Sequence, residues 1–182
     1  ISFPRLRPAS GVQPGETWRV GDYDFKRLVA ILRLSVPYTG MILTCRESTK
    51  LRNEMIAFGV SQIDGGSSIG IGSYSCNDPE KFKKSQFLLG DNRSLDEVIR
   101  ELCDAGFIPS FCTGCYRKGR TGEHFMEFAI PGFVKRFCTP NAVLTFLEYL
   151  NDYASGETLE AGLRQIDREL EAMPESKAKE EL

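Results

Sequence analysis

The fold class is decided by a short and nearly continuous apolar run, Gly40-Met41-Ile42-Leu43-Thr44-Cys45. Such a run is typical of a strand that is buried on both faces of a parallel sheet. An amphipathic helix around residues 25–32 precedes it, and a second helix follows, beginning after Ser48 and stopping at Gly59. Another short strand is predicted at residues 60–63. This alternation of helix and strand predicts an α/β fold with parallel strands.

Polar residues follow both predicted strands. Arg46 and Glu47 come after the first, and a Gly- and Ser-rich turn at residues 64–68 comes after the second. Binding groups in parallel α/β folds collect at these carboxyl ends of strands. Arg46 is suited to binding a carboxylate through two parallel hydrogen bonds. The alternative is that Arg46 and Glu47 form a surface ion pair and that the turn is only a loop.

The second half of the chain carries the residues with the most specific spacing. Cys112 and Cys115 are separated by two residues, and Cys138 follows after twenty-two more. Gly114 lies within this knuckle and could adopt the positive φ that such a turn often needs. Thiolates gathered in this way suit zinc or an iron–sulfur cluster. A zinc site could take His124 as its fourth ligand, three cysteines alone would leave one iron of a four-iron cluster open, and a redox disulfide or buried thiols are further alternatives.

The other three cysteines, Cys45, Cys76 and Cys103, are predicted to pack in the interior. Basic residues flank the knuckle and could offset the negative charge of thiolates or of a cluster, or be ordinary solvated charges. These are Arg117, Lys118, Arg120, Lys135 and Arg136.

Three helices are expected in this half. A capping box at Ser94 begins the first, and Gly106 ends it. Thr139 and Pro140 are predicted to start the second, with Cys138 at its N-terminal side. The third is predicted at about residues 158–173 from its apolar spacing.

The composition is that of an ordinary globular chain. Of 182 residues, 41% are apolar and 26% charged, and the formal net charge is −2, which predicts no nucleic-acid or membrane partner. No apolar run of about eighteen residues and no signal peptide are visible. Six cysteines are too few for a disulfide scaffold of this length, so a reducing, cytoplasmic location is expected. The apolar start at Ile1, without a methionine, indicates the C-terminal piece of a longer protein.

The cysteine motif resembles a known family. Residues 112–117 (CTGCYR), residues 119–122 (GRTG) and the gap to Cys138 closely resemble the C-terminal motif of the radical-SAM tyrosine lyases that mature FeFe-hydrogenase. The segments at residues 1–7 and 44–48 are also similar to this family. The resemblance covers essentially the whole chain.

The resemblance implies an architecture in two parts. Residues 1–90 would form the last strands and helices of a (β/α)8 TIM-type radical-SAM barrel. Residues 91–182 would form a mainly helical C-terminal domain that carries an auxiliary iron–sulfur cluster. Since no Cys-x3-Cys-x2-Cys motif occurs in these 182 residues, the cluster that cleaves S-adenosylmethionine would belong to an N-terminal half of the same protein.

The resemblance also implies a function. The family uses S-adenosylmethionine and a 4Fe-4S cluster to split tyrosine into p-cresol and dehydroglycine, which yields carbon monoxide and cyanide on iron. Other hydrogenase maturation proteins would be partners. Cys112, Cys115 and Cys138 would ligate the auxiliary 4Fe-4S cluster, whose open iron would face an additional iron. Arg46, Gln62 and Ser67 would face substrate or S-adenosylmethionine.

A second hypothesis comes from a different class of protein. Cys112, Cys115, Cys138 and His124 would hold a structural zinc, and the chain would serve as a non-enzymatic docking module. The metal content of the protein distinguishes the two hypotheses.

Overall fold

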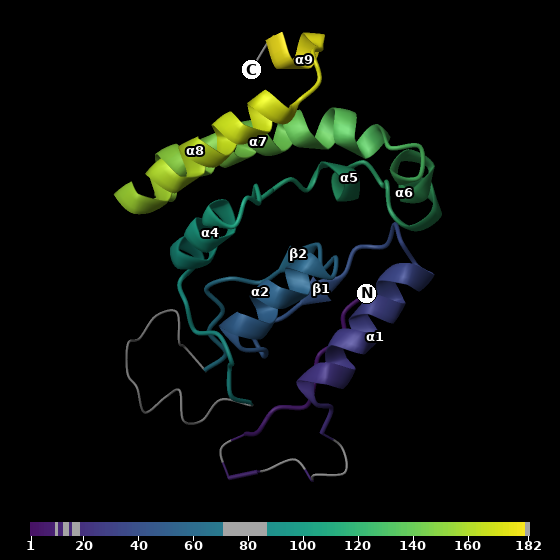
Figure 1. The fold of residues 1–182 in the computed structure, drawn as a ribbon, viewed down its shortest axis with the longest axis vertical. Helices are drawn as coiled ribbons and strands as arrows, with labels where there is room; N and C mark the ends of the chain where they lie inside the picture. The colour runs from purple at the N-terminus through teal and green to yellow at the C-terminus, as the bar shows by residue number, and fades with distance from the viewer. Residues whose placement is uncertain (10, 13–14, 16–18, 71–86, 181–182) are drawn as a thin grey trace. The chain divides into compact units, whose positions relative to one another are not determined.

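A computed structural model describes residues 1–9, 11–12, 15, 19–70 and 87–180. The chain divides into two compact units, Ile1–Ser94 and Leu95–Leu182. The first unit contains α1 (Asp22–Ser35), β1 (Ile42–Leu43), α2 (Thr49–Ala57) and β2 (Gln62–Ile63) (Figure 1). The second contains α4 (Leu95–Asp104), α5 (Gly114–Arg117), α6 (Gly122–Ala129), α7 (Phe133–Tyr153), α8 (Gly156–Ala172) and α9 (Lys177–Glu180).

The sheet of the first unit is small and parallel. Ile42 pairs with Gln62 and Leu43 with Ile63, so the predicted parallel pairing of the two apolar runs is confirmed. The N-terminal residues also join β1, since the Ile42 N–H donates to the Ile1 carbonyl at 2.8 Å. The described residues therefore form a mixed fold, mainly helical with a short parallel sheet, rather than a closed barrel.

Both strands are shorter than the sequence pattern predicts. Beyond the end of β1, the Cys45 carbonyl accepts hydrogen bonds from the N–H groups of Gly90 and Asp91 at 2.9 and 3.1 Å. A Cβ on Gly90 would lie 2.5 Å from the carbonyl carbon of Glu47, so only glycine fits there. The backbone after β1 thus bonds to a segment more than forty residues away.

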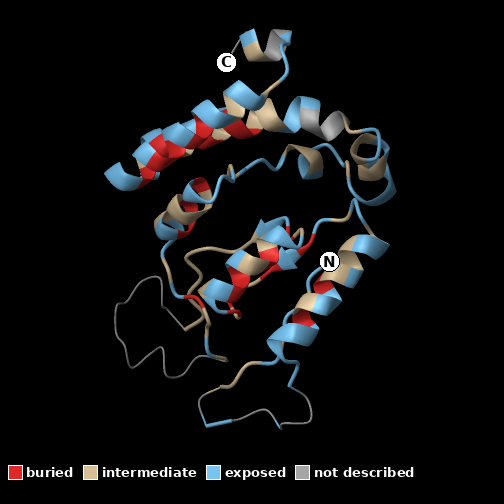
Figure 2. Cartoon of the chain, viewed as in Figure 1, coloured by how far each residue is buried: buried red, intermediate tan, exposed pale blue. Residues whose placement is uncertain are grey.

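The core of the first unit lies between α1, α2 and the two strands. Ser48 caps α2 as predicted, because its side chain accepts a hydrogen bond from the Leu51 N–H. Figure 2 shows buried positions on α1 and α2. The buried apolar cluster consists of Phe25, Val29, Met41, Leu43, Leu51, Met55 and Val60.

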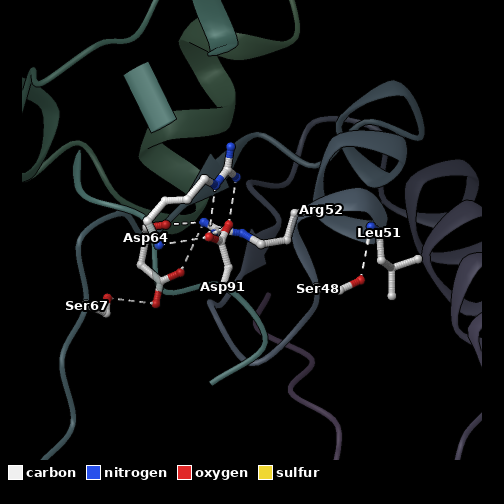
Figure 3. A network of polar contacts seen from close by, with 7 residues as sticks. Ser48, Leu51, Arg52, Asp64, Ser67 and Asp91 are labelled. Atoms are coloured by element: carbon white, nitrogen blue, oxygen red, sulfur yellow. Dashed lines mark hydrogen bonds and ion pairs between the residues drawn. The ribbon is translucent and has the colours of Figure 1, made fainter. Parts of the chain in front are cut away.

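A buried ion pair lies beside this core, after the ends of the strands (Figure 3). Arg52 of α2 donates from Nη1 to Asp91 Oδ2 at 2.5 Å and from Nη2 to the Asp64 carbonyl. The Arg52 and Asp91 side chains are each 1% exposed. Burial alone would raise the pKa of Asp91, but hydrogen bonds from Arg93 and the charges of both arginines hold it well below its usual range.

The second unit is built on α4, α7 and α8. Its buried cluster consists of Ile99, Cys103, Val143, Phe146, Leu150, Ala161 and Ile166. Asp96 of α4 accepts hydrogen bonds from the backbone N–H of Ser155 at 3.0 Å and from the hydroxyl of Thr158 at 2.8 Å. These bonds attach α4 to the first turn of α8, where Ser155 is the N-cap residue.

Helix α7 begins earlier than the sequence predicts. Gly132, with φ of 78°, turns the chain directly before Phe133, and the helix then runs through Pro140 to Tyr153. The expected start at Thr139 and Pro140 is therefore wrong. Cys138 lies inside α7, so the N-terminal helix charge expected to act on it is more than a turn away. Residues 133–139 contain neither glycine nor proline, so the helix extends upstream of Pro140 as far as Gly132.

Among the described residues, no helix has both the length and the apolar character needed to cross a membrane.

Helices α7 and α8 approach closely at Gly162, so an added methyl group at this position should destabilise the protein. A Cβ on Gly162 would lie 2.5 Å from Leu150 Cδ2, and Leu150 is held in the core. We expect Gly162→Ala to lower the free energy of unfolding by roughly 1–3 kcal/mol through overpacking, and with it the unfolding midpoint, although alanine favours helices. Gly156→Ala is the control, because no atom lies within 4 Å of its added Cβ. Thermal unfolding followed by circular dichroism measures both, and equal midpoints would contradict the packing argument.

The buried ion pair predicts an acid-dependent stability. Asp91→Asn removes the fully buried carboxylate that faces Arg52 and leaves that arginine only the half-exposed Asp64, which should cost roughly 3 kcal/mol. Because folding lowers the pKa of Asp91, its contribution is present above the ordinary aspartate pKa of about 3.9 and disappears as the pH falls below it. Denaturant unfolding between pH 7 and pH 3 should show a smaller pH dependence in Asp91→Asn than in the wild type. Asp104→Asn, at an exposed position, should behave like the wild type.

Candidate metal centre

The knuckle is built around a single turn of helix. Helix α5 begins at Gly114, whose N–H donates to the Cys112 sulfur at 3.3 Å. A Cβ on Gly114 would lie 3.4 Å from the same sulfur. Gly114 does not adopt a positive φ, contrary to the expectation from the sequence. A side chain at this position would meet the Cys112 sulfur at an ordinary contact distance, so neither the space nor the backbone requires glycine there.

A second turn brings the chain back to Cys115. Gly119 has a φ of 66°, a left-handed conformation that favours glycine. The Arg120 N–H then donates to the Cys115 carbonyl at 2.9 Å. This hydrogen bond holds the backbone of Arg120 beside the knuckle.

Cys138 reaches the same place from α7. A cavity of about 380 Å³ is lined by Cys112, Gly114, Cys115, Arg120, Phe125, Phe128, Phe137, Cys138 and Asn141. The three cysteines singled out by their spacing are therefore gathered around one cavity. Phe125 and Phe128 come from α6, a helix the sequence analysis does not predict, and they line the cavity because residues three apart share a helix face.

The electrostatics of the cavity are those of grouped thiols beside one cation. Burial raises the pKa of Cys138, and the nearby Cys115 and Cys112 raise it further, while Arg120 lowers it. These influences place all four groups within electrostatic reach of one another. Among the described residues that line the cavity, Arg120 is the cation and no carboxylate is present.

The lining of the cavity fits the thiolate ligands of a multinuclear cluster. Among the described residues, no three histidine, cysteine or acidic side chains converge closely enough to hold one metal ion. Zinc needs its sulfur ligands about 2.3 Å away, around one point, whereas the thiolates of an iron–sulfur cluster lie on different irons around a larger volume. Cysteines that line a cavity match the second arrangement.

His124 does not join the cysteines. It lies on α6, and its Nδ1 is 2.9 Å from Glu127 Oε2, one turn along the same helix. The imidazole is half exposed and packs edge-on against Phe128. It is not among the residues that line the cavity, so the described geometry does not bring the proposed fourth zinc ligand to the site.

The remaining cysteines are interior residues. Cys45 and Cys103 are 4% and 1% exposed, so their predicted packing role is confirmed. Burial raises the pKa of each thiol to about 11, which keeps both protonated at neutral pH. Cys76 lies outside the described residues.

Arg120 differs from the other basic residues near the knuckle. Arg117, Lys118 and Arg136 are exposed and do not line the cavity. The side chain of Lys135 lies outside the described part of the chain.

The candidate substrate residues of the first unit lie apart from this cavity in sequence and have partners of their own. Arg46 follows β1, and its guanidinium carbon lies 3.9 Å from the centre of the Phe87 ring. Gln62 is an exposed residue of β2 rather than a residue beyond its end. The Ser67 hydroxyl donates to Asp64 Oδ2 at 3.2 Å (Figure 3). Their contact with substrate stays a prediction.

The alternative in which Glu47 forms a surface ion pair with Arg46 is wrong, because Glu47 pairs with Arg5 instead. The Glu47 side chain is 1% exposed and is bound by Arg5, whose Nε donates to Glu47 Oε1 at 3.1 Å. Sequence reasoning also missed Arg52 and Asp91 as the central polar pair after the strands. Arg52 lies on the predicted face of α2 among apolar residues, where a charge signals a buried partner.

The chain matches a known domain family. The profile of the Biotin and Thiamin Synthesis associated domain matches residues 2–108. No curated protein matches the chain. Because the matched residues make up more than half of the sequence, the chain belongs to this family. The three cysteines lie beyond the matched residues.

Solved structures relate the chain to a particular protein of this kind. A crystal structure of HydG, a maturase of FeFe-hydrogenase, is 47% identical with a TM-score of 0.87, over 99% of this chain and 38% of that one. HydG from Carboxydothermus hydrogenoformans is 39% identical with a TM-score of 0.70, over 95% of this chain and 35% of that one. The chain thus spans little more than a third of the HydG chains it matches. The predicted resemblance to this group of maturases is confirmed.

Proposed function

We propose that this chain provides the auxiliary-cluster site, and part of the barrel, of a radical-SAM enzyme that matures FeFe-hydrogenase. The observation that carries the proposal is the gathering of Cys112, Cys115 and Cys138 around one cavity. The similarity to HydG, which extends over the cysteine-bearing unit, supports the same assignment.

The three thiolates would hold a 4Fe-4S cluster. When bound with three cysteine ligands, such a cluster supplies one iron with an open coordination position. The chain's own residues serve this arrangement in separate ways. The cysteines bind, Arg120 offsets negative charge, and the phenylalanines of the cavity lining limit the access of water.

The full enzyme would be a carbon–carbon lyase that acts on tyrosine. It would form p-cresol and dehydroglycine, and the dehydroglycine would be the source of carbon monoxide and cyanide on iron. S-adenosylmethionine and a second 4Fe-4S cluster would be held by an N-terminal part, since the motif for that cluster is absent from this sequence. Other hydrogenase maturation proteins would be its partners.

Residues after the strands of the first unit would contact the substrate or S-adenosylmethionine. Arg46 is the best supported, because it follows β1 directly and Phe87 holds its guanidinium by a cation–π contact. Its role would be to bind a carboxylate, the group that tyrosine and S-adenosylmethionine share. Gln62 and Ser67 are weaker candidates, since one is exposed and the other bonds to Asp64.

Metal analysis of the 182-residue chain tests the cluster assignment. We expect about four irons and four sulfides per chain after anaerobic reconstitution, with a paramagnetic resonance signal on reduction. Cys112→Ala should lose this signal because the cluster loses a ligand. Cys103→Ala should keep it, because that thiol is buried in the core.

Zinc would contradict the assignment. A colourless protein that holds one zinc, and that iron cannot displace, would indicate the structural docking module instead. In that case His124→Ala should release the metal, whereas it should leave a three-cysteine cluster in place.

The reaction itself is tested in the full-length protein. We expect p-cresol from tyrosine and S-adenosylmethionine, and a raised KM for one of these two in Arg46→Ala because a carboxylate contact is lost. Arg27→Ala, at an exposed position of α1, is the control. Folded wild-type protein that makes no p-cresol would sink the lyase proposal. Unchanged kinetics of Arg46→Ala would remove only the role of Arg46.

A further inference from the structure

Arg120 is held at the cavity by its backbone and by an aromatic ring. Its N–H donates to the carbonyl of Cys115 at 2.9 Å, directly after the left-handed Gly119. Its guanidinium carbon lies 5.6 Å from the centre of the Phe128 ring, within the range of a cation–π contact. Both contacts are with residues that line the cavity, so the arginine is fixed relative to the three thiols.

One donor of this arginine lacks a partner. The Nε of Arg120 is buried, and no described residue accepts a hydrogen bond from it. A buried N–H of a charged group without an acceptor is destabilising, and such groups in folded proteins generally have a partner. The cavity beside this atom is lined by sulfur and aromatic side chains, with no carboxylate among the described lining residues. The described lining residues therefore offer it no anionic acceptor there.

The other cations of this region lack these properties. Arg117 and Lys118 belong to the same run of sequence, yet their side chains are exposed and do not line the cavity. Solvent screens exposed charges strongly, whereas a partly buried charge acts over short distances with little screening. Arg120 also lies within electrostatic reach of Cys138.

Hydrogen bonds to sulfur, nearby charge and solvent exposure together set the reduction potential of an iron–sulfur cluster. A positive charge and an N–H donor both stabilise the reduced state, since reduction adds negative charge that is partly carried by the sulfurs. A half-buried arginine beside three cysteine ligands supplies both effects.

We propose that Arg120 is a positioning residue of the cluster, which donates its Nε–H to a cluster sulfide or a cysteine sulfur and raises the cluster's reduction potential. This inference rests on the proposed function, because it presumes that Cys112, Cys115 and Cys138 hold an iron–sulfur cluster. It goes beyond it by assigning a separate task to a residue that is not a ligand.

The midpoint potential tests the inference directly. The wild type and the variants Arg120→Gln, Arg120→Lys and Arg117→Gln are reconstituted anaerobically and titrated with dithionite, with the paramagnetic resonance signal as the readout. Arg120→Gln removes the charge and should shift the potential to a more negative value. Arg120→Lys keeps the charge but lacks the Nε–H, so its potential should lie between the potentials of the wild type and Arg120→Gln. Arg117→Gln removes an exposed charge of the same run and should match the wild type.

The outcomes separate the two proposals. Wild-type protein that takes up no iron and sulfide overturns the proposed function and this inference with it. Wild type and Arg120→Gln that both hold the cluster at the same potential overturn only the role of Arg120. If Arg120→Gln binds less iron, Arg120→Lys decides: an unshifted potential there overturns the hydrogen bond to sulfur. An equal shift in Arg117→Gln would also contradict the inference, because an exposed arginine would then affect the potential as much as an arginine that lines the cavity.

Discussion

The first unit depends on the ion pair between Arg52 and Asp91. Both side chains are almost fully buried, and a buried charge needs close partners of the opposite sign, which Arg93 and Asp64 add to the pair. The pair links α2 to the segment after Gly90, and the contact of Arg52 with the Asp64 carbonyl adds the residues after β2. A two-residue strand pair is too small to hold these segments together. The contacts of Arg52 therefore fix the positions of the segments that contain Asp64 and Asp91.

The apolar core of the second unit and its cysteine-lined cavity lie at different places. Helices α4, α7 and α8 bury the hydrophobic residues, while the knuckle and α6 contribute to the cavity without a buried residue of their own. Cys138 connects these regions, because it shares α7 with Phe146 and Leu150. A helix anchored in the core can thus place a cysteine at a cavity outside that core.

Local patterns in the sequence were sufficient for the strands, the Ser48 cap and the interior cysteines, since each depends on neighbouring residues. They failed where the partner is distant. Glu47 is bound by Arg5, forty-two residues away, and no local signal reveals that pairing. The cysteine spacing identified the three residues that share a cavity, but five flanking cations looked alike. Of the flanking cations that the structure describes, Arg120 is distinguished by its place in the cavity lining and its contact with Phe128.

Pro140 has a consequence for how the two ends of α7 behave. Having no N–H, it cannot donate to the carbonyl four residues before it, so one backbone bond of the helix is missing just after Cys138. The helix can therefore bend most easily at this point, between its end at the cavity and its end in the core. The end that carries Cys138 lies before the missing bond, and the end that packs Leu150 in the core lies after it.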